Sequence, residues 1–256
     1  MFKPFGYYYY PSAKSFLEQL YYRIFGLPFL SSHLVYRLII KHVIFKKEDR
    51  ILDYGTGDGV FLNQLSATFG VTGIGIDRLA SRVALADKVN NLFELGNQFL
   101  RGDFSQIQSV EKFDKILCLD VLEHVENPEK EIKLMNLHLK MGGELIIQTP
   151  RDQDRKFILK DERFDYGHDR HIHKGFNREE LSSVLTRLGF RIKYWQSDFG
   201  FFSQMVYEVL EVVRRRSREF YYLLWPIFYP LCLVDIFYNR PLKSNGLFIV
   251  AIKIAS

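Results

Sequence analysis

The chain has 256 residues, a formal net charge of +5 and 16% aromatic residues. This length suits one domain with a large core, and the modest basic excess does not call for a nucleic-acid partner. The two cysteines, Cys118 and Cys232, stand in apolar segments, so we expect buried thiols and neither a disulfide nor metal ligands. The first residues lack the apolar stretch of a secretion signal, and we expect a cytoplasmic protein.

The pattern of helices and strands predicts an α/β fold. Ser12 can cap a helix that runs to about Phe25, and Ser31 or Ser32 can cap a second helix. Strands and helices then alternate with short links, which predicts a parallel sheet with helices on both faces. The expected strands are 50–54, 72–77, 98–101, 114–120 and 144–149, and the expected helices begin at about residue 58 and span 79–95 and 127–139.

The second half of the chain adds a loop, a helix and two strands. Residues 150–176 read as a long loop rich in Asp, Arg and His, and loops of this length are usually functional. Asn177 caps a helix that ends at Gly189, and strands follow at 190–195 and 246–254. We expect one domain in four segments: a helical cap at 1–47, a core at 48–196, a helical apolar insertion at 197–245 and the last strand at 246–256.

The most informative segment is residues 51–62, where an apolar strand ends in Asp53 and a glycine turn follows. Glycines at 55, 57 and 59 leave room for a ligand to approach the backbone, because they carry no Cβ. A dinucleotide site expects its third glycine at position 60, where this chain has Val60. A carboxylate at position 53 would repel a diphosphate and attract a cationic ammonium or sulfonium group.

Acidic residues also end the next three strands. Asp77 follows Asp53 by 24 residues, close to the spacing of a ribose-binding acid. Asp103 and Phe104 end the third strand, and Asp120 ends the fourth. Because parallel strands end at one edge, these carboxylates should line one crevice with the glycine turn.

Together these segments resemble the class I methyltransferases that use S-adenosylmethionine (SAM) and release S-adenosylhomocysteine. The resemblance covers roughly residues 48–196 and implies a Rossmann-like seven-stranded sheet whose last strand is antiparallel. It implies that Asp53 and the glycines contact the methionine part, Asp77 the ribose, Asp103 with Phe104 the adenine, and that Asp120 lies near the methyl group. The expected cofactor-binding residues are Asp53, Tyr54, Gly55, Thr56, Gly57, Asp77, Arg78, Asp103, Phe104, Asp120 and Val121.

Histidines are the candidate general bases, because imidazole titrates near neutral pH. We name His124, His171 and His173 as catalytic candidates, with His168 in the same loop. The segment from Asp120 to His124 also resembles a Glu-x-x-Glu-His motif of quinone-biosynthesis O-methyltransferases and of metal-using RNA-end methyltransferases. A divalent ion is therefore an alternative, but Asp replaces the first Glu and we expect no metal.

Aromatic residues gather at the two ends of the chain. Residues 221–236 carry only one charge, Asp235, but are too short and too interrupted by prolines for a membrane span. We expect a helical lid or a dimer face packed on the sheet. The alternative is a membrane-surface patch with the basic residues 214–218 at anionic headgroups.

The function expected from these features is methyl transfer from SAM to a small-molecule or lipid- or glycan-linked acceptor, at an oxygen atom. Two alternatives stay open: an RNA methyltransferase, and a membrane-associated protein that keeps the SAM fold without turnover. We expect no nucleic-acid partner, and a cytoplasmic location that includes peripheral contact with the inner membrane surface. The oligomeric state is not predicted.

Overall fold

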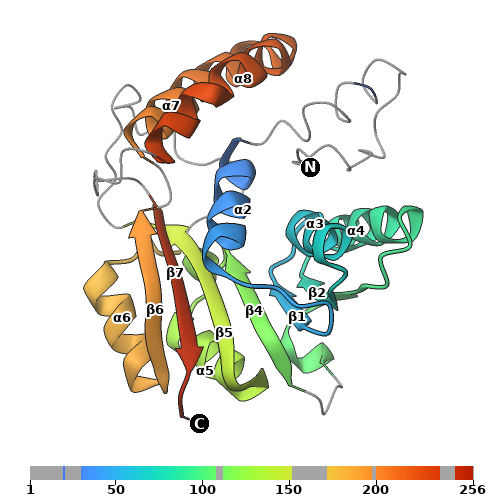
Figure 1. Cartoon of the computed structure of the whole chain (residues 1–256), viewed down its shortest axis with the longest axis vertical. Coiled ribbons are helices and arrows are strands. Elements are labelled where there is room, and N and C mark those ends of the chain that lie inside the picture. The colour runs from blue at the N-terminus through green and yellow to red at the C-terminus, as the bar shows by residue number, and fades with distance from the viewer. Residues whose placement is uncertain are drawn as a thin grey trace.

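The computed structural model describes residues 20, 30–107, 112–151, 172–197, 200–236 and 246–255. Their centre is a seven-stranded sheet in the order β3-β2-β1-β4-β5-β7-β6 (Figure 1). The strands are β1 (Arg50–Tyr54), β2 (Thr72–Asp77), β3 (Gln98–Arg101), β4 (Phe113–Leu119), β5 (Leu139–Pro150), β6 (Phe190–Ser197) and β7 (Gly246–Lys253). Only β7 runs against its neighbours β5 and β6, which confirms the predicted sheet with an antiparallel last strand.

Two layers of helices cover the sheet because successive strand residues point to opposite faces. Ile51 packs with α2 (Leu30–His42), α3 (Val60–Phe69) and α4 (Ala80–Leu92) on one face. Its neighbour Leu52 packs with α5 (Pro128–His138) and α6 (Arg178–Arg187) on the other. Both cores extend across the width of the sheet, which fixes the carboxyl edge of β1, β2 and β4 as a rigid frame.

The insertion before the last strand forms a helical hairpin of α7 (Phe201–Arg216) and α8 (Arg218–Cys232). In Figure 1 the pair lies beyond the upper edge of the sheet, the edge at which β6 ends. Its buried residues form a third apolar cluster with Leu30 and Leu34 of α2. Among the described residues this buried cluster joins the hairpin to α2 and includes no residue of the sheet, so the expected packing of this insertion on the sheet stays a prediction.

Some element boundaries also differ from those expected. Residues 141–143 lie inside β5, where a register irregularity places residues 140–143 between the pairs Phe113–Leu139 and Lys115–Glu144. The helix expected over 79–95 ends at Leu92. Pro226 and Pro230 stay inside α8 and do not break it. The helix expected from Ser12 to Phe25 lies outside the described residues, apart from Leu20.

Among the described residues, no helix is both long enough and apolar enough to cross a membrane. Cys118 and Cys232 are both buried and free, as expected.

Candidate active site

The glycine turn after β1 adopts backbone angles that favour glycine. Gly55 and Gly57 have φ of 77° and 55°. A Cβ on Gly55 would stand 2.2 Å from Cγ2 of Val121, so the turn packs tightly against the end of β4. A Cβ on Gly57 would meet nothing closer than Nη1 of Arg82 at 3.9 Å. Gly57 therefore keeps its backbone open to the crevice, which is where a ligand can approach closely.

Asp53 is buried beneath this turn. Its Oδ2 accepts a hydrogen bond of 2.7 Å from the Thr56 hydroxyl. Burial raises the pKa of Asp53 to about 6, although the Thr56 hydroxyl opposes the shift. Both residues line a cavity of about 270 Å³ between the turn, α2 and α4. A buried carboxylate facing a cavity is suited to a cationic ligand group.

Asp77 connects the ends of β2 and β1. Its Oδ2 accepts a hydrogen bond of 2.9 Å from the Gly57 amide, and its Oδ1 accepts one of 2.8 Å from the Leu79 amide. These two backbone donors fix the plane of the carboxylate at the crevice wall. Each oxygen keeps further acceptor capacity that can serve ligand hydroxyls.

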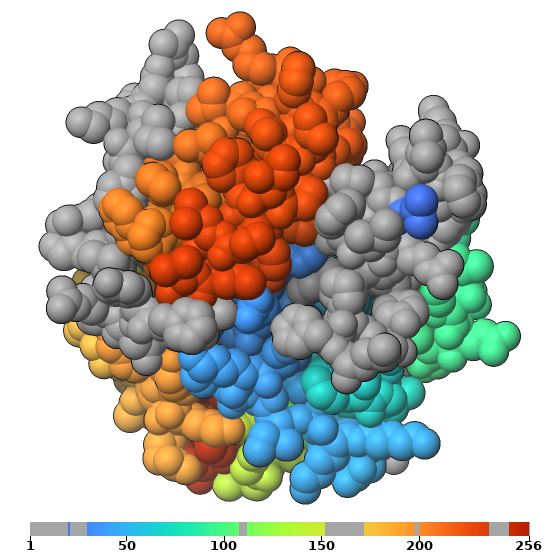
Figure 2. Space-filling view, turned by 45° about the horizontal axis from the view of Figure 1, so that its top comes forward, coloured from blue at the N-terminus to red at the C-terminus, as the bar shows by residue number. Residues whose placement is uncertain are grey.

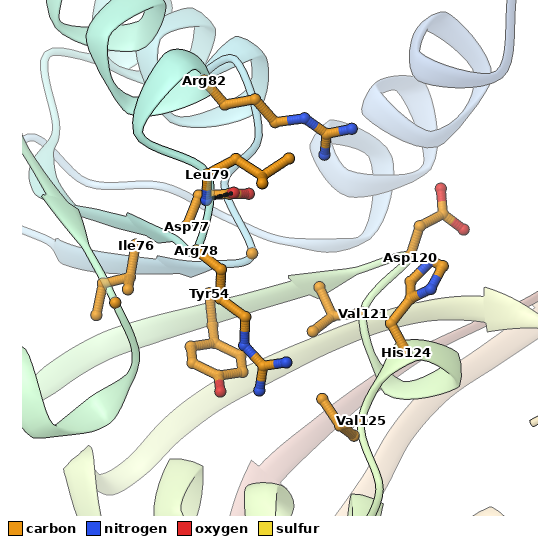
Figure 3. A pocket seen from close by; sticks show the side chains of 12 residues that line it. Tyr54, Ile76, Asp77, Arg78, Leu79, Arg82, Asp120, Val121, His124 and Val125 are labelled. Carbon is orange, nitrogen blue, oxygen red and sulfur yellow. Dashed lines mark hydrogen bonds between the residues drawn. The ribbon is translucent and has the colours of Figure 1, made fainter. Parts of the chain in front are cut away.

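A second cavity of about 340 Å³ adjoins the turn (Figure 3). In this view Leu79 and Arg82 form one wall, while Asp120, Val121 and His124 form the opposite wall. The complete lining is Tyr54, Gly55, Ile76, Asp77, Arg78, Leu79, Arg82, Gly102, Asp120, Val121, His124 and Val125. Apolar and charged side chains thus share one crevice, as expected for a ligand with an aromatic base and charged ends.

Asp120 is held in an unusual conformation at the end of β4. Its φ of 52° is left-handed, a region that non-glycine residues rarely adopt, and such strain is typical of functional sites. Its amide donates to the carbonyl of Gln148. The side chain is exposed at the crevice, on the same side as the imidazole of His124 (Figure 3). The imidazole and the carboxylate therefore lie on the same wall of the crevice.

Glu123 lies buried behind this pair. Its Oε2 accepts a hydrogen bond of 3.1 Å from the Thr149 hydroxyl, and its side chain shares a hydrogen bond with Asp120. Burial raises the pKa of Glu123, and the negative charge of Asp120 raises it further. Burial raises the pKa of Asp120 as well, against the lowering effects of Gln148 and His124. The two carboxyl groups thus favour a state in which they share a proton.

Several predicted site residues line these two cavities. Tyr54, Gly55, Asp77, Arg78, Asp120, Val121 and His124 line the larger one, while Asp53, Thr56 and Gly57 line the smaller one with Gly55. The Tyr54 hydroxyl, however, donates to Oε2 of Glu131 on the α5 side of the sheet. The structure therefore brings the glycine turn and the ends of β1, β2 and β4 together around these two cavities.

The remaining predicted residues lie elsewhere. Phe104 is buried and stacks on Tyr54 at 4.4 Å between ring centroids, so its ring belongs to the core. Asp103 accepts a hydrogen bond from the Ser105 amide, which lowers the pKa of its exposed side chain. Nε2 of His173 donates to the carbonyl of Val125 at 3.0 Å, a contact that holds a loop. His171 and His168 lie outside the described residues.

Sequence reasoning missed Arg82, whose side chain reaches from α4 and lines both cavities. Its position one turn into the helix after Asp77 was the available signal, because that turn faces the carboxyl edge. It also missed Glu123 as the buried partner of Asp120. Among the described residues, no cluster of three or more His, Cys, Asp or Glu side chains is arranged to hold a metal ion.

The fold and this crevice define a methyltransferase domain that uses SAM. A family model described as a methyltransferase domain matches residues 29–194. The chain belongs to this family of SAM-dependent methyltransferases.

Curated relatives match a shorter stretch. The chain is 33% identical over 110 residues to a protein of Rickettsia felis named ubiquinone biosynthesis O-methyltransferase, over 43% of this chain and 44% of that protein. It is 34% identical over 116 residues to a protein of the same name from Glaesserella parasuis, over 43% and 49% of the two chains. The chain spans about half the length of the curated relatives it matches.

Solved structures agree on the fold. A Haemonchus contortus phosphoethanolamine N-methyltransferase 2 in complex with SAM matches with a TM-score of 0.65 and 19% identity, over 92% of this chain and 56% of that chain. The [4+2]-cyclase SpnF matches with a TM-score of 0.62 and 17% identity, over 87% and 81%. Because one of these two proteins is named as a cyclase, the likeness in shape shows the fold alone.

Proposed function

We propose that this chain transfers a methyl group from SAM to an oxygen atom of a small-molecule or lipid-linked acceptor. The observation that carries the proposal is the placement of His124 and Asp120 together on one wall of the crevice, next to the glycine turn. The name shared by the relatives, ubiquinone biosynthesis O-methyltransferase, supports oxygen as the methylated atom and a phenolic acceptor.

The donor set of the crevice fits the chemical groups of SAM. The Asp53 carboxylate suits the ammonium group, and the guanidinium of Arg82, which lines both cavities, suits the carboxylate of the methionine part. Asp77 can accept from the two ribose hydroxyls while its amide contacts hold it in place. Ile76, Leu79 and Val121 offer apolar surface to the adenine.

SAM supplies an electrophilic methyl group on a sulfonium, and the chain has to align an acceptor oxygen with it. His124 can accept the proton that the acceptor hydroxyl loses as the new carbon–oxygen bond forms. The Asp120 carboxylate beside it stabilises the resulting imidazolium by charge attraction. A proton shared between Asp120 and Glu123 would reduce the negative charge on Asp120 and so weaken its stabilisation of the imidazolium. The contact with Glu123 therefore influences how strongly Asp120 assists His124.

The test is methyl transfer from labelled SAM to a panel of phenols and catechols, each offered with and without an isoprenoid tail. We expect transfer by the wild type, and a kcat about 100-fold lower for His124→Gln with SAM affinity unchanged. His138→Gln is the matched control, because His138 binds the Leu134 carbonyl within α5 and lines neither cavity. Absence of transfer to every acceptor, or full activity of His124→Gln, would overturn the proposal.

A further inference from the structure

The outer face of α8 carries three large apolar side chains in solvent. Phe220, Leu223 and Ile227 are exposed to 62%, 60% and 64%. Their spacing of three and four residues places them on one face of the helix. We call this set the α8 stripe. Single exposed apolar residues are ordinary on protein surfaces, but an aligned set on one helix marks an interaction surface.

The inner face of α8 is firmly anchored. Tyr221, Trp225 and Cys232 are buried against Leu30 and Leu34 of α2. The ring of Trp225 lies 4.8 Å from that of His33, and Nη1 of Arg37 donates to the Tyr229 hydroxyl at 3.3 Å. The helix is therefore held in this orientation by its own packing, and the α8 stripe faces outward as a consequence.

A basic cluster flanks the stripe at the α7–α8 junction. Arg214, Arg215, Arg216 and Arg218 are all exposed. Glu211 pairs with Arg214 at 2.7 Å and with Arg215 at 3.0 Å. Even with Glu211 and Glu219 counted, four arginines leave a positive charge beside the stripe. Figure 2 shows the surface of the two helices, in orange and red, forming the upper part of the molecule.

We propose that the α7–α8 hairpin docks on an anionic lipid bilayer, with the α8 stripe at the level of the acyl chains and the arginines at the phosphate groups. Apolar side chains on one face of a helix, flanked by basic residues, are the combination that binds such surfaces. From Phe220 to Ile227 the helix rises only about 10 Å. Three side chains along this length offer far less area than the roughly 800 Å² per partner that a stable interface buries. Arginine-rich flanks also disfavour a second copy of the same surface.

The docked position has a consequence for the active site. Leu30 and Leu34 of α2 contact the hairpin, while Ser32 of the same helix lines the cavity beside Asp53. One helix thus separates the membrane surface from the crevice. An acceptor with a long isoprenoid tail could reach the crevice while the tail stays in the bilayer. The delivery of a tailed acceptor to the crevice rests on the proposed function. The docking of the hairpin on the bilayer does not.

Co-sedimentation with vesicles tests the proposal. We expect the wild type to bind vesicles of phosphatidylcholine with about 30% phosphatidylglycerol, and to bind neutral vesicles at least about tenfold more weakly. The triple variant Phe220→Ser, Leu223→Ser, Ile227→Ser should lose at least about tenfold in binding. The matched control replaces three exposed apolar residues elsewhere, Ile44→Ser, Leu92→Ser and Met141→Ser, and should bind like the wild type.

Three results would overturn docking: no vesicle binding by the wild type, equal loss in both triple variants, or a dimer in light scattering that only the stripe variant abolishes. Circular dichroism checks that the variants are folded. Transfer to a soluble acceptor without a tail, measured on the same proteins, separates the two proposals. Docking fails alone if transfer persists without vesicle binding, and the proposed function fails alone if vesicle binding persists without transfer.

Discussion

The carboxylate of Asp77 accepts a hydrogen bond of 2.9 Å from the amide of Gly57, and so ties the end of β2 to the turn that follows β1. The same carboxylate accepts from the Leu79 amide at the start of α4. One side chain therefore fixes both the turn and the helix that border the crevice. A ligand that binds to Asp77 meets a carboxylate whose orientation is already set, which lowers the ordering cost of binding.

Replacing Asp77 with Asn should weaken SAM binding by about 10- to 100-fold. The amide keeps one acceptor oxygen, but its NH₂ group faces a backbone N–H, and the charge that favours the ribose hydroxyls is lost. The measurement is the rise in melting temperature on adding SAM. Asp87→Asn in α4, which lines neither cavity, should show the wild-type rise. An unchanged rise in Asp77→Asn would contradict this role.

Gly55 and Gly142 both have left-handed backbone angles, with φ of 77° and 74°, but very different surroundings. A Cβ on Gly55 would clash with Val121, whereas one on Gly142 would meet nothing within 4 Å. Gly142→Ala should therefore cost about 1 kcal/mol from backbone strain, and Gly55→Ala roughly 2–4 kcal/mol. Urea unfolding measures both. If the clash is the cause, Val121→Ala should recover part of the loss in Gly55→Ala.

Asp53 should make stability and SAM binding respond oppositely to pH. Its pKa is raised from 3.8 to about 6 by burial. The stability that this shift contributes is fully present below the pKa of Asp53 in the unfolded chain. It is lost as the pH rises through about 6, the pKa in the folded protein. Asp53→Asn, which keeps an acceptor for Thr56, should thus raise the unfolding free energy at pH 7.5 by up to about 2 kcal/mol.

SAM binding should weaken in the same Asp53→Asn variant and, in the wild type, below about pH 6, because the ammonium group needs the ionised carboxylate. Thr56→Val removes the hydroxyl that lowers the pKa of Asp53, so its affinity should begin to fall at a higher pH than in the wild type. Calorimetric titration with SAM, repeated at steps of about one pH unit between pH 5 and 8, measures how the affinity changes. Equal affinity across this range would argue against Asp53 as the ammonium ligand.

Glu123→Gln tests the contact between the buried Glu123 carboxyl group and that of Asp120. Burial raises the pKa of Glu123, so its protonated form stabilises the fold and that contribution is lost as pH rises through the folded-state pKa. The free energy of unfolding of the glutamine variant should not fall in this way. Its difference from the wild-type value should therefore increase by roughly 1–3 kcal/mol between pH 6 and pH 9. Urea unfolding at the two pH values measures it, and exposed Glu126→Gln should follow the wild type.

The elements that the sequence predicted well are those with local signals. Residues 50–54 and 72–77 are short, mostly apolar runs that contain an acidic residue at or near their ends. These acidic residues, with the glycine turn after the first run, locate the crevice without any long-range information. The last strand was equally easy to predict, because β7 is buried along almost its whole length and its sequence is therefore almost continuously apolar. Local pattern and tertiary structure agree at these positions, which is the condition for reading a fold from sequence.

The contacts that the sequence did not predict depend on long-range packing. Helical periodicity identified α7 and α8 as apolar helices but could not say that Trp225 meets α2 and not the sheet. The ring of Phe104 turns into the core because a short 3₁₀ helix, Phe104–Gln106, begins there. The reach of Arg82 across the crevice depends on where α4 starts relative to β2, a matter of one or two residues.

The central claim is that the crevice at the glycine turn holds SAM. Its most direct test is calorimetric titration of the wild type and Gly57→Ala with SAM, and with NAD in parallel. Gly57 opens on the crevice, so a Cβ there occupies ligand space with no core atom within 3.9 Å. We predict micromolar SAM binding by the wild type, at least about tenfold weaker binding by folded Gly57→Ala, and no NAD binding. Equal SAM binding by both proteins, or binding of NAD in place of SAM, would contradict the claim.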